Sequence, residues 1–535
     1  MKKFNKAVSI ALVSTIAGGL LVGCGSSASS DTVATTATTQ TEDSTAAETS
    51  TASSAANAES SGNGVEFSFF GAIWDPYKEQ SDILDAWQKN ANCKIDFEWV
   101  QEDSYDTQLA AKVASQDLPD VIKKEDGNVD DLIDQGLILP LDDYLEEYCP
   151  HYLAQLTDDD LAALKNPKDG KIYGLSLIVN NEAAYSTMIR TDWLTNLGLD
   201  EPETWDDWVN VWKAFKDNDA NGDGDATNEI PLAVSYDQFY MLENMFGIES
   251  NGYFSVVDGK YVYDPENPKY EEFLDQMREL YSDGILYSEF ITCDQEQLNT
   301  IGSNNTLGST VNWAEQAKNY SLACQELGNK DALYSCVTPI TGPDGDQKIQ
   351  ARTKLSENTF FTVKAQDRLP QILQAFDYLY SDDGIILTNY GIEGQTFDYD
   401  ESGNPVVKAP YNTDFATARG YDLIPSIIPF VFLHDSYMQY LMGGKTEDEL
   451  DAAGKSFVDG LTINDDYYYQ APKLYSTDAW VEHSDLVEQQ IALRDNYIMG
   501  KISKDDYNTQ YQELKDAGLQ DVIDQAQSAY EAVAQ

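Results

Sequence analysis

The chain has 535 residues, of which 34 are Lys or Arg and 92 are Asp or Glu, so its formal net charge at pH 7 is -58. A surface this negative repels a phosphate backbone, which argues against nucleic-acid binding and makes a neutral ligand more favourable than a polyanionic one. The length suggests about two to four domains. A hydrophobic content of 42% supplies large cores, so global disorder is excluded.

The first 24 residues have the pattern of a secreted lipoprotein. A basic start, MKKFNK, precedes a short apolar stretch that ends in Leu21-Val22-Gly23-Cys24. The string LVGC resembles the processing site of bacterial lipoproteins, which implies a signal peptide at 1–23 and acylation of Cys24. We therefore expect a protein on the extracytoplasmic face of the cell membrane, held only by its lipid anchor.

Residues 24–64 follow as a tether. Beyond Cys24 they are almost entirely Ser, Thr, Ala, Gly and acids, with no aromatic and no basic side chain, so they cannot nucleate a core. A flexible chain of this length reaches roughly 35 Å on average. No later stretch is apolar for the ~18 residues that a membrane span requires.

The body opens with alternating strand and helix patterns. VEFSFFGAIW, CKIDFEWV and PDVIK are typical of strands, and the segments between them place apolar residues at helical spacing. This alternation predicts a doubly wound α/β domain. We expect the C-terminal third to be largely helical.

A second block begins near Thr187 and contains a tryptophan-rich helix. Thr204 and Asp207 form a capping box. Five bulky side chains then recur at helical spacing, and we assign this stripe to a core and not to a sugar platform: Trp205, Trp208, Val209, Trp212 and Phe215.

Residues 217–229 carry a calcium-like pattern. Oxygen-bearing side chains at alternate positions, a central glycine and a closing carboxylate suit Ca²⁺. The twelve-residue calcium loop, which ends in a bidentate Glu, can be aligned here in two registers. If the loop begins at Asp217, its last position is Asn228; if it begins at Asp219, Glu229 lies one residue before the last position. We favour the second register and a structural Ca²⁺. The expected ligands are Asp219, Asn221, Asp223, Asp225, Asn228 and Glu229.

Catalytic motifs are not found. The sequence has no G-x-S-x-G, H-E-x-x-H or Cys-x-x-Cys pattern, and its three histidines are far apart. Cys24 aside, five cysteines remain, so at least one thiol is unpaired; Cys324 and Cys336 are the candidate disulfide. Trp74 and Trp313 follow strand-like segments and are candidates for stacking on sugar rings.

Six stretches resemble the extracellular solute-binding proteins of family one. These are carbohydrate-binding lipoproteins of ABC importers, related to maltose-binding and alginate-oligosaccharide-binding proteins. The matching stretches are ASQDLPDVI (114–122), DGKIYGL (169–175), IRTDWLTNLGL (189–199), DANGDGDATNEIPL (219–232), LYSDDGIILTNYGIEGQTF (379–397) and YIMGKISKDDYNTQYQELKDAGL (497–519).

The resemblance implies a two-lobed α/β fold of the periplasmic-binding-protein type II, with discontinuous lobes joined by hinge strands. The first lobe would comprise 65–180 and 353–408, and the second 181–352 and 409–535. The chain would cross near Asn180, Thr353 and Lys408.

The resemblance also implies ligand contacts in the cleft between the lobes. Lys123 and Lys124 stand where some relatives have an aromatic residue, which leaves room for an acidic group on the ligand. The expected ligand-binding residues are Trp74, Trp313, Tyr236, Phe239, Tyr240, Asn180, Asn181, Glu182 and Lys124.

The expected protein is thus a monomeric, lipid-anchored receptor, not an enzyme. It would capture an oligosaccharide and deliver it to the permease of an ABC transporter. The alternatives are a surface-anchored glycan-degrading enzyme, a calcium-dependent docking module, and a receptor of the same family for a peptide or another small solute.

Overall fold

The computed structural model describes residues 64–73, 81–124, 129–166, 168–179, 185–351, 354–412, 428–442, 445, 447–462, 467–474 and 477–533. The chain divides into Met1–Ser60, which holds no described residue, and Ser61–Gln535, which holds all of them. Cys24, Trp74 and the crossover residues Asn180, Asn181 and Glu182 lie outside the described residues. In the part that is described, no helix has the length and apolar character to cross a membrane.

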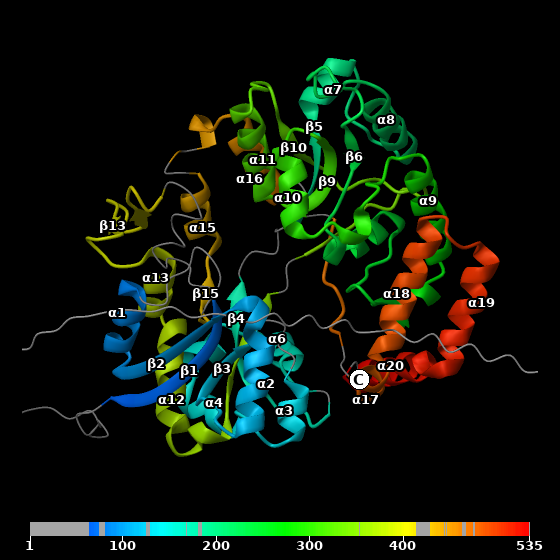
Figure 1. Cartoon of the computed structure of the whole chain (residues 1–535). Coiled ribbons are helices and arrows are strands. Elements are labelled where there is room, and N and C mark those ends of the chain that lie inside the picture. The colour runs from blue at the N-terminus through cyan, green and yellow to red at the C-terminus, as the bar shows by residue number, and fades with distance from the viewer. Residues whose placement is uncertain are drawn as a thin grey trace, which may run out of the picture. The chain divides into compact units, whose positions relative to one another are not determined.

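A six-stranded sheet forms the first half of the body, in the order β15-β4-β12-β3-β1-β2 (Figure 1). Its strands are β1 Val65–Ile73, β2 Cys93–Gln101, β3 Val121–Lys124, β4 Gly174–Val179, β12 Leu355–Phe361 and β15 Val431–Phe432. β1 is parallel to β2 and β3, and β15 is parallel to β4. β12 runs antiparallel to both of its neighbours, β3 and β4, so every strand except β12 points the same way. The predicted α/β domain is confirmed, with one reversed strand.

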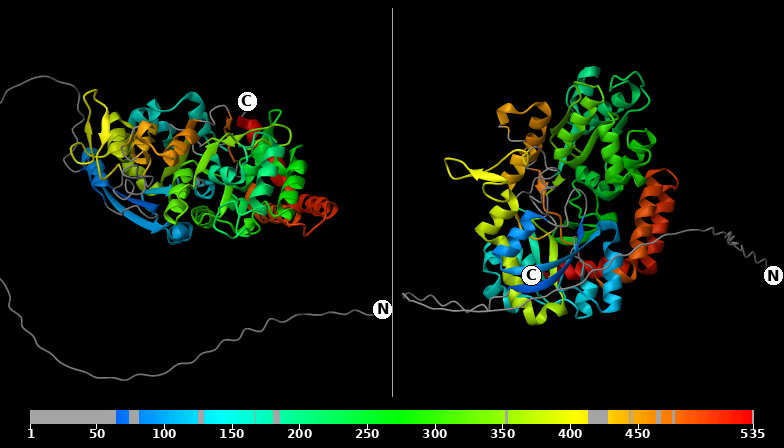
Figure 2. Two further views of the ribbon diagram at one scale, coloured as in Figure 1. Left: turned by 90° about the horizontal axis from the view of Figure 1, so that it is seen from above. Right: turned by 60° about the vertical axis from the view of Figure 1, so that its left-hand side comes forward.

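Helices pack around this sheet and close the first core. They are α1 Asp82–Asn90, α2 Tyr105–Ser115, α3 Asp130–Asp134, α4 Asp142–Tyr148, α5 Pro150–Ala154, α6 Asp158–Ala163, α12 Leu369–Asp377, α13 Asp382–Tyr390 and α15 His434–Leu441. The predicted helix after β1 buries Trp87, whose indole N–H donates to the carbonyl of Ala375 on α12 at 2.8 Å. A hairpin of β13 Phe397–Tyr399 and β14 Pro405–Val407 extends beside α13 (Figure 2).

A four-stranded sheet, in the order β10-β5-β9-β6, forms the second half. Its strands are β5 Tyr185–Arg190, β6 Ile230–Leu232, β9 Leu307–Trp313 and β10 Tyr334–Val337. β5 is antiparallel to β9 and β10, whereas β6 is parallel to β9. The 3₁₀ helix η2, Tyr236–Phe246, follows β6.

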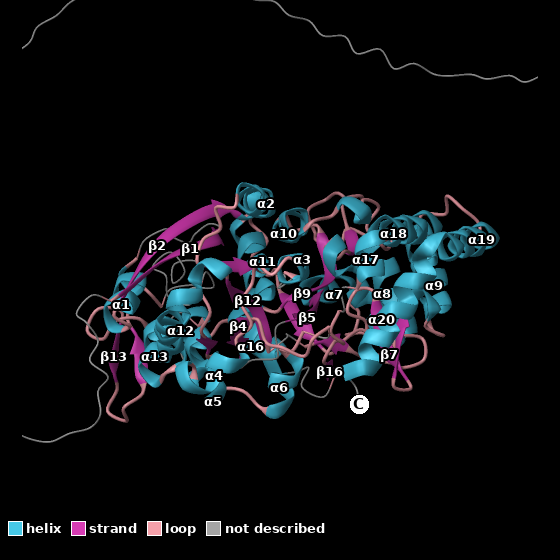
Figure 3. Cartoon of the chain, turned by 90° about the horizontal axis from the view of Figure 1, so that it is seen from below, coloured by secondary structure: helices cyan, strands magenta, loops and turns pink. Residues whose placement is uncertain are grey.

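Helices also surround the second sheet. They are α7 Thr191–Leu197, α8 Trp205–Asp217, α9 Tyr270–Ser282, α10 Gln295–Ser303, α11 Glu315–Glu326, α16 Ala452–Thr462, α17 Asp478–Glu482, α18 Ser484–Ile498, α19 Lys504–Leu514 and α20 Gln520–Val533. The last three lie on the side of α9 (Figure 3), beside the hairpin of β7 Phe254–Val257 and β8 Lys260–Tyr263. The helical C-terminal third is confirmed.

The tryptophan stripe of α8 lies in the second core, as predicted, with two exceptions. Trp208, Trp212 and Phe215 are at most 1% exposed, and the Trp212 indole donates to Ser309 Oγ on β9 at 2.9 Å. Two residues of the stripe remain partly exposed: Trp205, the first residue of the helix, and Val209.

The strand pairing shows that the chain leaves the first sheet later than the predicted crossing at Lys408. Val431 of β15 pairs with Ile178 of β4, and Phe430 and Tyr440 belong to the first core. The segment 428–441 therefore belongs with the first sheet, and the predicted boundary at Lys408 is wrong. A buried apolar strand needs a sheet edge, and β4 supplies one. The chain joins the second core at α16, where Ser456 Oγ accepts from the Cys336 backbone N–H at 2.8 Å.

All five described cysteines are free thiols, so the candidate disulfide between Cys324 and Cys336 is wrong. Burial raises the pKa of the Cys336 thiol to about 11 and that of Cys93 to about 12.

A buried ion pair joins β5 to α7. The guanidinium of Arg190 donates to both carboxylate oxygens of Asp192, at 2.7 and 2.6 Å, and to Asn305 Oδ1 at 2.7 Å. It also lies over the rings of Trp193 and Tyr334, at 4.9 and 5.1 Å from their centroids. Both charged side chains are almost fully buried, so each depends on the other for neutralisation.

We expect Asp192→Asn to reduce the free energy of unfolding by about 3–5 kcal/mol, because it leaves the Arg190 guanidinium buried without a countercharge. Urea unfolding measures this difference. Asp200→Asn, an exposed carboxylate after the same helix, is the control and should change stability by less than about 0.5 kcal/mol. Equal effects of the two substitutions would contradict the role of the ion pair.

Candidate ligand-binding site

The second sheet brings several aromatic side chains to one edge. β6 and β9 are parallel and β5 is antiparallel to β9, so the ends of β6 and β9 and the start of β5 lie at the same edge. Ligands of α/β proteins bind in crevices beyond the carboxyl ends of such strands.

Trp313 ends β9, and its partner across the sheet is Tyr185, which begins β5. Their ring centroids are 4.4 Å apart and their planes are inclined by 36°. Both rings are partly exposed. The hydroxyl of Tyr468, on β16 Tyr468–Tyr469, donates to the carbonyl of Tyr185 at 3.1 Å. The rings are therefore held by the sheet and a neighbouring strand.

Tyr240 of η2 continues this surface. Its hydroxyl donates to Gln350 Oε1, on β11 Ile349–Gln350, which pairs with β16. Burial, and then the proximity of Tyr185, raise the pKa of Tyr240. We name Tyr185, Trp313, Tyr240 and Tyr468 the aromatic wall. Of these four, the sequence pointed to Trp313 and Tyr240; Tyr185 and Tyr468 depend on strand pairing that the sequence does not reveal.

The other two aromatic candidates on η2 have different environments. Phe239 is 1% exposed, packs on Phe290 and lies beneath the Arg494 guanidinium at 4.8 Å, so it is a core residue and not the expected ligand contact. Because a 3₁₀ helix has three residues per turn, Phe239 lies on the same buried face of η2 as Leu242. Tyr236 is partly exposed, and its hydroxyl donates to Asp495 Oδ2 at 2.5 Å.

At the first sheet, the parallel strands β1, β3 and β4 end at a common edge. Trp74 follows β1 directly in the sequence, and Asn180 follows β4, but both lie outside the described residues. Lys124, at the end of β3, is ion-paired with Asp106 at 2.9 Å. Its charge is thus already balanced within the protein, which weakens the argument for an acidic group on the ligand.

The acidic loop 217–229 is tied together by its own side chains. Asp219 Oδ2 accepts from the Gly224 backbone N–H at 2.9 Å, and Glu229 Oε1 accepts from that of Ala220 at 3.0 Å. Asn228 Nδ2 donates to Asp223 Oδ2 at 2.7 Å. These bonds hold the two ends of the loop together.

Two carboxylate oxygens of this loop are buried without a hydrogen-bond donor among the described residues: Asp219 Oδ1 and Glu229 Oε2. Burial, and to a smaller extent the charge of Asp219, raise the pKa of Glu229. Orphaned carboxylate oxygens fit a hard cation chemically. Within the described ranges, however, no group of three or more Asp, Glu, His or Cys side chains is assembled for a metal, and Asp225 bonds instead to Thr227 at 2.6 Å.

The family model "Bacterial extracellular solute-binding protein" matches residues 75–386, more than half of the chain. The chain belongs to this family. The expected family and the expectation of a solute-binding protein, not an enzyme, are thereby confirmed.

Individual relatives and structures agree with this assignment. The solute-binding protein is 27% identical over 333 residues to lipoprotein LipO of Bacillus subtilis, covering 60% of this chain and 64% of LipO. It is 27% identical over 357 residues to the fructooligosaccharide ABC transporter substrate-binding protein FusA of Streptococcus pneumoniae. This alignment covers 62% of this chain and 64% of FusA. The alignments thus span just under two thirds of each relative.

Solved structures confirm the fold class. The alginate-binding protein AlgQ2, determined without calcium ion, superposes with a TM-score of 0.71 at 20% identity, covering 87% of this chain and 98% of AlgQ2. An EF-hand mutant of FusA superposes with a TM-score of 0.66 at 21% identity, covering 87% and 99%.

A buried polar network underlies η2 in this solute-binding protein. Arg494 pairs with Asp495, the acceptor of the Tyr236 hydroxyl, at 2.9 Å. Glu243 and Asp264 lie nearby, 2% exposed, and each has one oxygen without a donor among the described residues. Burial raises the pKa of Asp264 to about 7, and burial together with the charge of Asp264 raises the pKa of Glu243.

We expect stability to fall as pH rises through 7. The folded-state pKa of Asp264 lies above its ordinary value, so its stabilising contribution is full at acidic pH and is lost as the carboxyl ionises. Asp264→Asn should reduce the loss of unfolding free energy between pH 6 and 8 by about 1 kcal/mol, measured by urea unfolding. The control, Asp258→Asn at an exposed position, should leave the dependence of unfolding free energy on pH unchanged. The prediction is contradicted if Asp264→Asn shows the same pH dependence as the unmodified protein.

Proposed function

We propose that this protein is a lipid-anchored receptor that captures an oligosaccharide and delivers it to the permease of an ABC transporter. The observation that carries the proposal is the aromatic wall at a strand edge of a chain that belongs to a solute-binding family. FusA, which takes fructooligosaccharides and serves an ABC transporter, supports the ligand class and the partner.

The chemistry of the wall suits a sugar. The apolar faces of pyranose and furanose rings pack on flat aromatic side chains, while directed polar groups bind the hydroxyls. Tyr240 and Tyr468 hold their hydroxyls in internal hydrogen bonds, so their rings are oriented before a ligand arrives. The net charge of -58 and the Lys124–Asp106 pair favour a neutral sugar.

The ligand would be enclosed between two lobes. We place the first at 65–180 and 353–441 and the second at 181–352 and 452–535, following the two sheets. Trp74, Asn180, Asn181 and Glu182 would contact the sugar from the crossover and the first lobe. Contacts with both lobes would favour the closed form, which the permease would then recognise.

The N-terminus would set the location. Acylation of Cys24 and the tether 24–64 would keep the receptor at the extracytoplasmic face of the membrane as a monomer. LipO, described as a lipoprotein, supports this anchoring.

We expect Trp313→Ala to weaken sugar binding about a hundredfold. A sugar at a hundred times its dissociation constant stabilises the unmodified protein by about 2.7 kcal/mol, and after a hundredfold loss by only about 0.4 kcal/mol. Thermal unfolding against neutral and acidic oligosaccharides and peptides, starting with kestose, measures this difference. Trp480→Ala, partly buried against Tyr253, is the control and should keep the ligand-induced stabilisation.

Other outcomes would contradict the proposal. Consumption of the sugar would indicate an enzyme, and stabilisation by a peptide alone would indicate a different solute. An unchanged response of Trp313→Ala would exclude the aromatic wall as the binding surface.

We further propose that the loop 217–229 binds a structural Ca²⁺. Asp219 and Glu229 would be its central ligands, because each offers a buried oxygen without a donor in the described part of the chain. Asn221, Asp223 and Asn228 would complete the set, with Asp225 through its carbonyl. The FusA structure described as an EF-hand mutant supports such a site in a relative.

We expect the effect of Glu229→Gln on stability to have opposite signs without and with calcium. Without calcium the substitution relieves repulsion between Glu229 and Asp219, so stability is equal or higher. With calcium it removes a ligand and should cancel most of the ~2.7 kcal/mol that Ca²⁺ provides at a hundred times its dissociation constant. Calorimetry in EGTA and in calcium compares the two states. Asp217→Asn tests the alternative register: a larger calcium effect there would overturn our assignment.

A further inference from the structure

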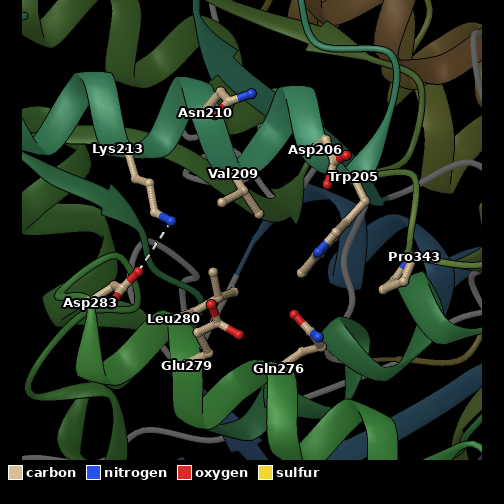
Figure 4. Close-up of a pocket in the computed structure, with 10 residues that line it drawn as sticks. All are labelled: Trp205, Asp206, Val209, Asn210, Lys213, Gln276, Glu279, Leu280, Asp283 and Pro343. Carbon is tan, nitrogen blue, oxygen red and sulfur yellow. Dashed lines mark ion pairs between the residues drawn. The ribbon is translucent and has the colours of Figure 1, made fainter.

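A cavity of ≈ 520 Å³ lies between α8 and α9, and none of the residues of the aromatic wall lines it (Figure 4). Asp206 and Lys213 of α8 face Gln276 and Glu279 of α9, and Asp283 directly after α9, across it. Both helices belong to the second half of the body, so the cavity is built within one lobe.

Trp205 is the distinctive side chain of this cavity. Its ring packs edge-on against Trp212 and Phe246, with centroids 5.9 and 5.8 Å away, yet it stays partly exposed while Trp208 and Trp212 are buried. Figure 4 shows the indole extending from α8 into the cavity. No residue in the described part of the chain accepts a hydrogen bond from its N–H. A ring held at its edge and open toward a cavity is available to a ligand.

An ion pair and a turn border the cavity around Trp205. At one end the Lys213 ammonium and the Asp283 carboxylate are 3.3 Å apart. At the other, Pro343 lies on a turn whose Gly342 backbone packs so closely on Met245 that a Cβ would be 1.6 Å from its carbonyl oxygen. The turn closes with a hydrogen bond from the Gly342 N–H to the Asp346 carbonyl at 2.9 Å.

The polar groups indicate the ligand. Glu279 and Asp206 accept hydrogen bonds, the Trp205 indole donates them, and the Gln276 amide does both; for the Gln276 amide no partner is found among the described residues. A hydroxyl satisfies both kinds of group, whereas an organic cation would leave the indole N–H without an acceptor. Three carboxylates against one ammonium disfavour an anionic sugar. The Trp205 ring, Val209, Leu280 and Pro343 supply apolar surface for the C–H face of a sugar ring.

We propose that this cavity is a second carbohydrate site, on the outer side of the second lobe, for a neutral, hydroxyl-rich glycan. It is distinct from the transport site and would retain a glycan at the receptor without occupying the aromatic wall. Its binding does not depend on the proposed transport function.

The test uses ¹⁹F NMR of the full chain labelled with 5-fluorotryptophan, in which Trp205→Phe identifies the Trp205 signal. Maltoheptaose, cellohexaose and kestose are titrated to millimolar concentration. At least one should shift the Trp205 signal saturably, and the shift should persist in Trp313→Ala. Glu279→Gln should weaken this binding about tenfold, since a hydrogen bond to a charged acceptor is lost. Glu272→Gln, an exposed acid two turns earlier on α9 that does not line the cavity, should leave it unchanged.

Several results would overturn the proposal. They are no saturable shift with any of the three sugars, a shift that disappears in Trp313→Ala, or equal effects of Glu279→Gln and Glu272→Gln. A shift with spermidine in place of the sugars would assign the cavity to an organic cation, and equal binding of trigalacturonate would refute the neutral class.

Discussion

The buried pair of Arg190 and Asp192 lies where the acidic loop meets the strand that carries Trp313. A guanidinium inside a core is costly unless its charge is neutralised. Asp192 neutralises Arg190, Asn305 Oδ1 accepts from the same guanidinium, and the Asn305 carbonyl in turn accepts from Asn221 of the acidic loop at 3.3 Å. Asn305 lies just before β9, whose far end carries Trp313. One strand thus links the calcium-like loop to the aromatic wall.

Sequence patterns predicted which face of a helix is buried, whereas contacts between distant segments depend on how the strands pair. The period of the tryptophan stripe indicated that α8 buries Trp208 and Trp212, because one helix face determines this. No such pattern shows that Tyr185 lies beside Trp313, since their contact depends on the order of strands in the sheet. The same holds for β15: its apolar residues predict a buried strand but do not specify which sheet receives it. Phe239 and Tyr240 are adjacent in sequence, and only the 3₁₀ turn sends one into the core.

The acidic loop shows how far composition alone can specify a metal site. The sequence identified the oxygen-rich set, but two registers remained because acids occur at nearly every second position. Burial favours the register from Asp219 that we propose: Asp219 and Glu229 each have a buried carboxylate oxygen, whereas Asp225 accepts from Thr227 and Asp217 is exposed. Two converging carboxylates repel each other unless a proton or a cation lies between them. Burial and, to a smaller extent, the charge of Asp219 accordingly raise the pKa of Glu229.

The excess of acids also bears on how this protein can recognise sugars. With 92 acidic and 34 basic residues, charged acceptors greatly outnumber charged donors. A hydroxyl-rich ligand suits such a surface because each hydroxyl donates to a carboxylate and accepts from the few N–H and O–H groups available. In the cavity between α8 and α9 those groups are the Trp205 indole and the Gln276 amide. At the aromatic wall the phenols of Tyr240 and Tyr468 already donate to internal acceptors, so these two residues offer a sugar their ring faces.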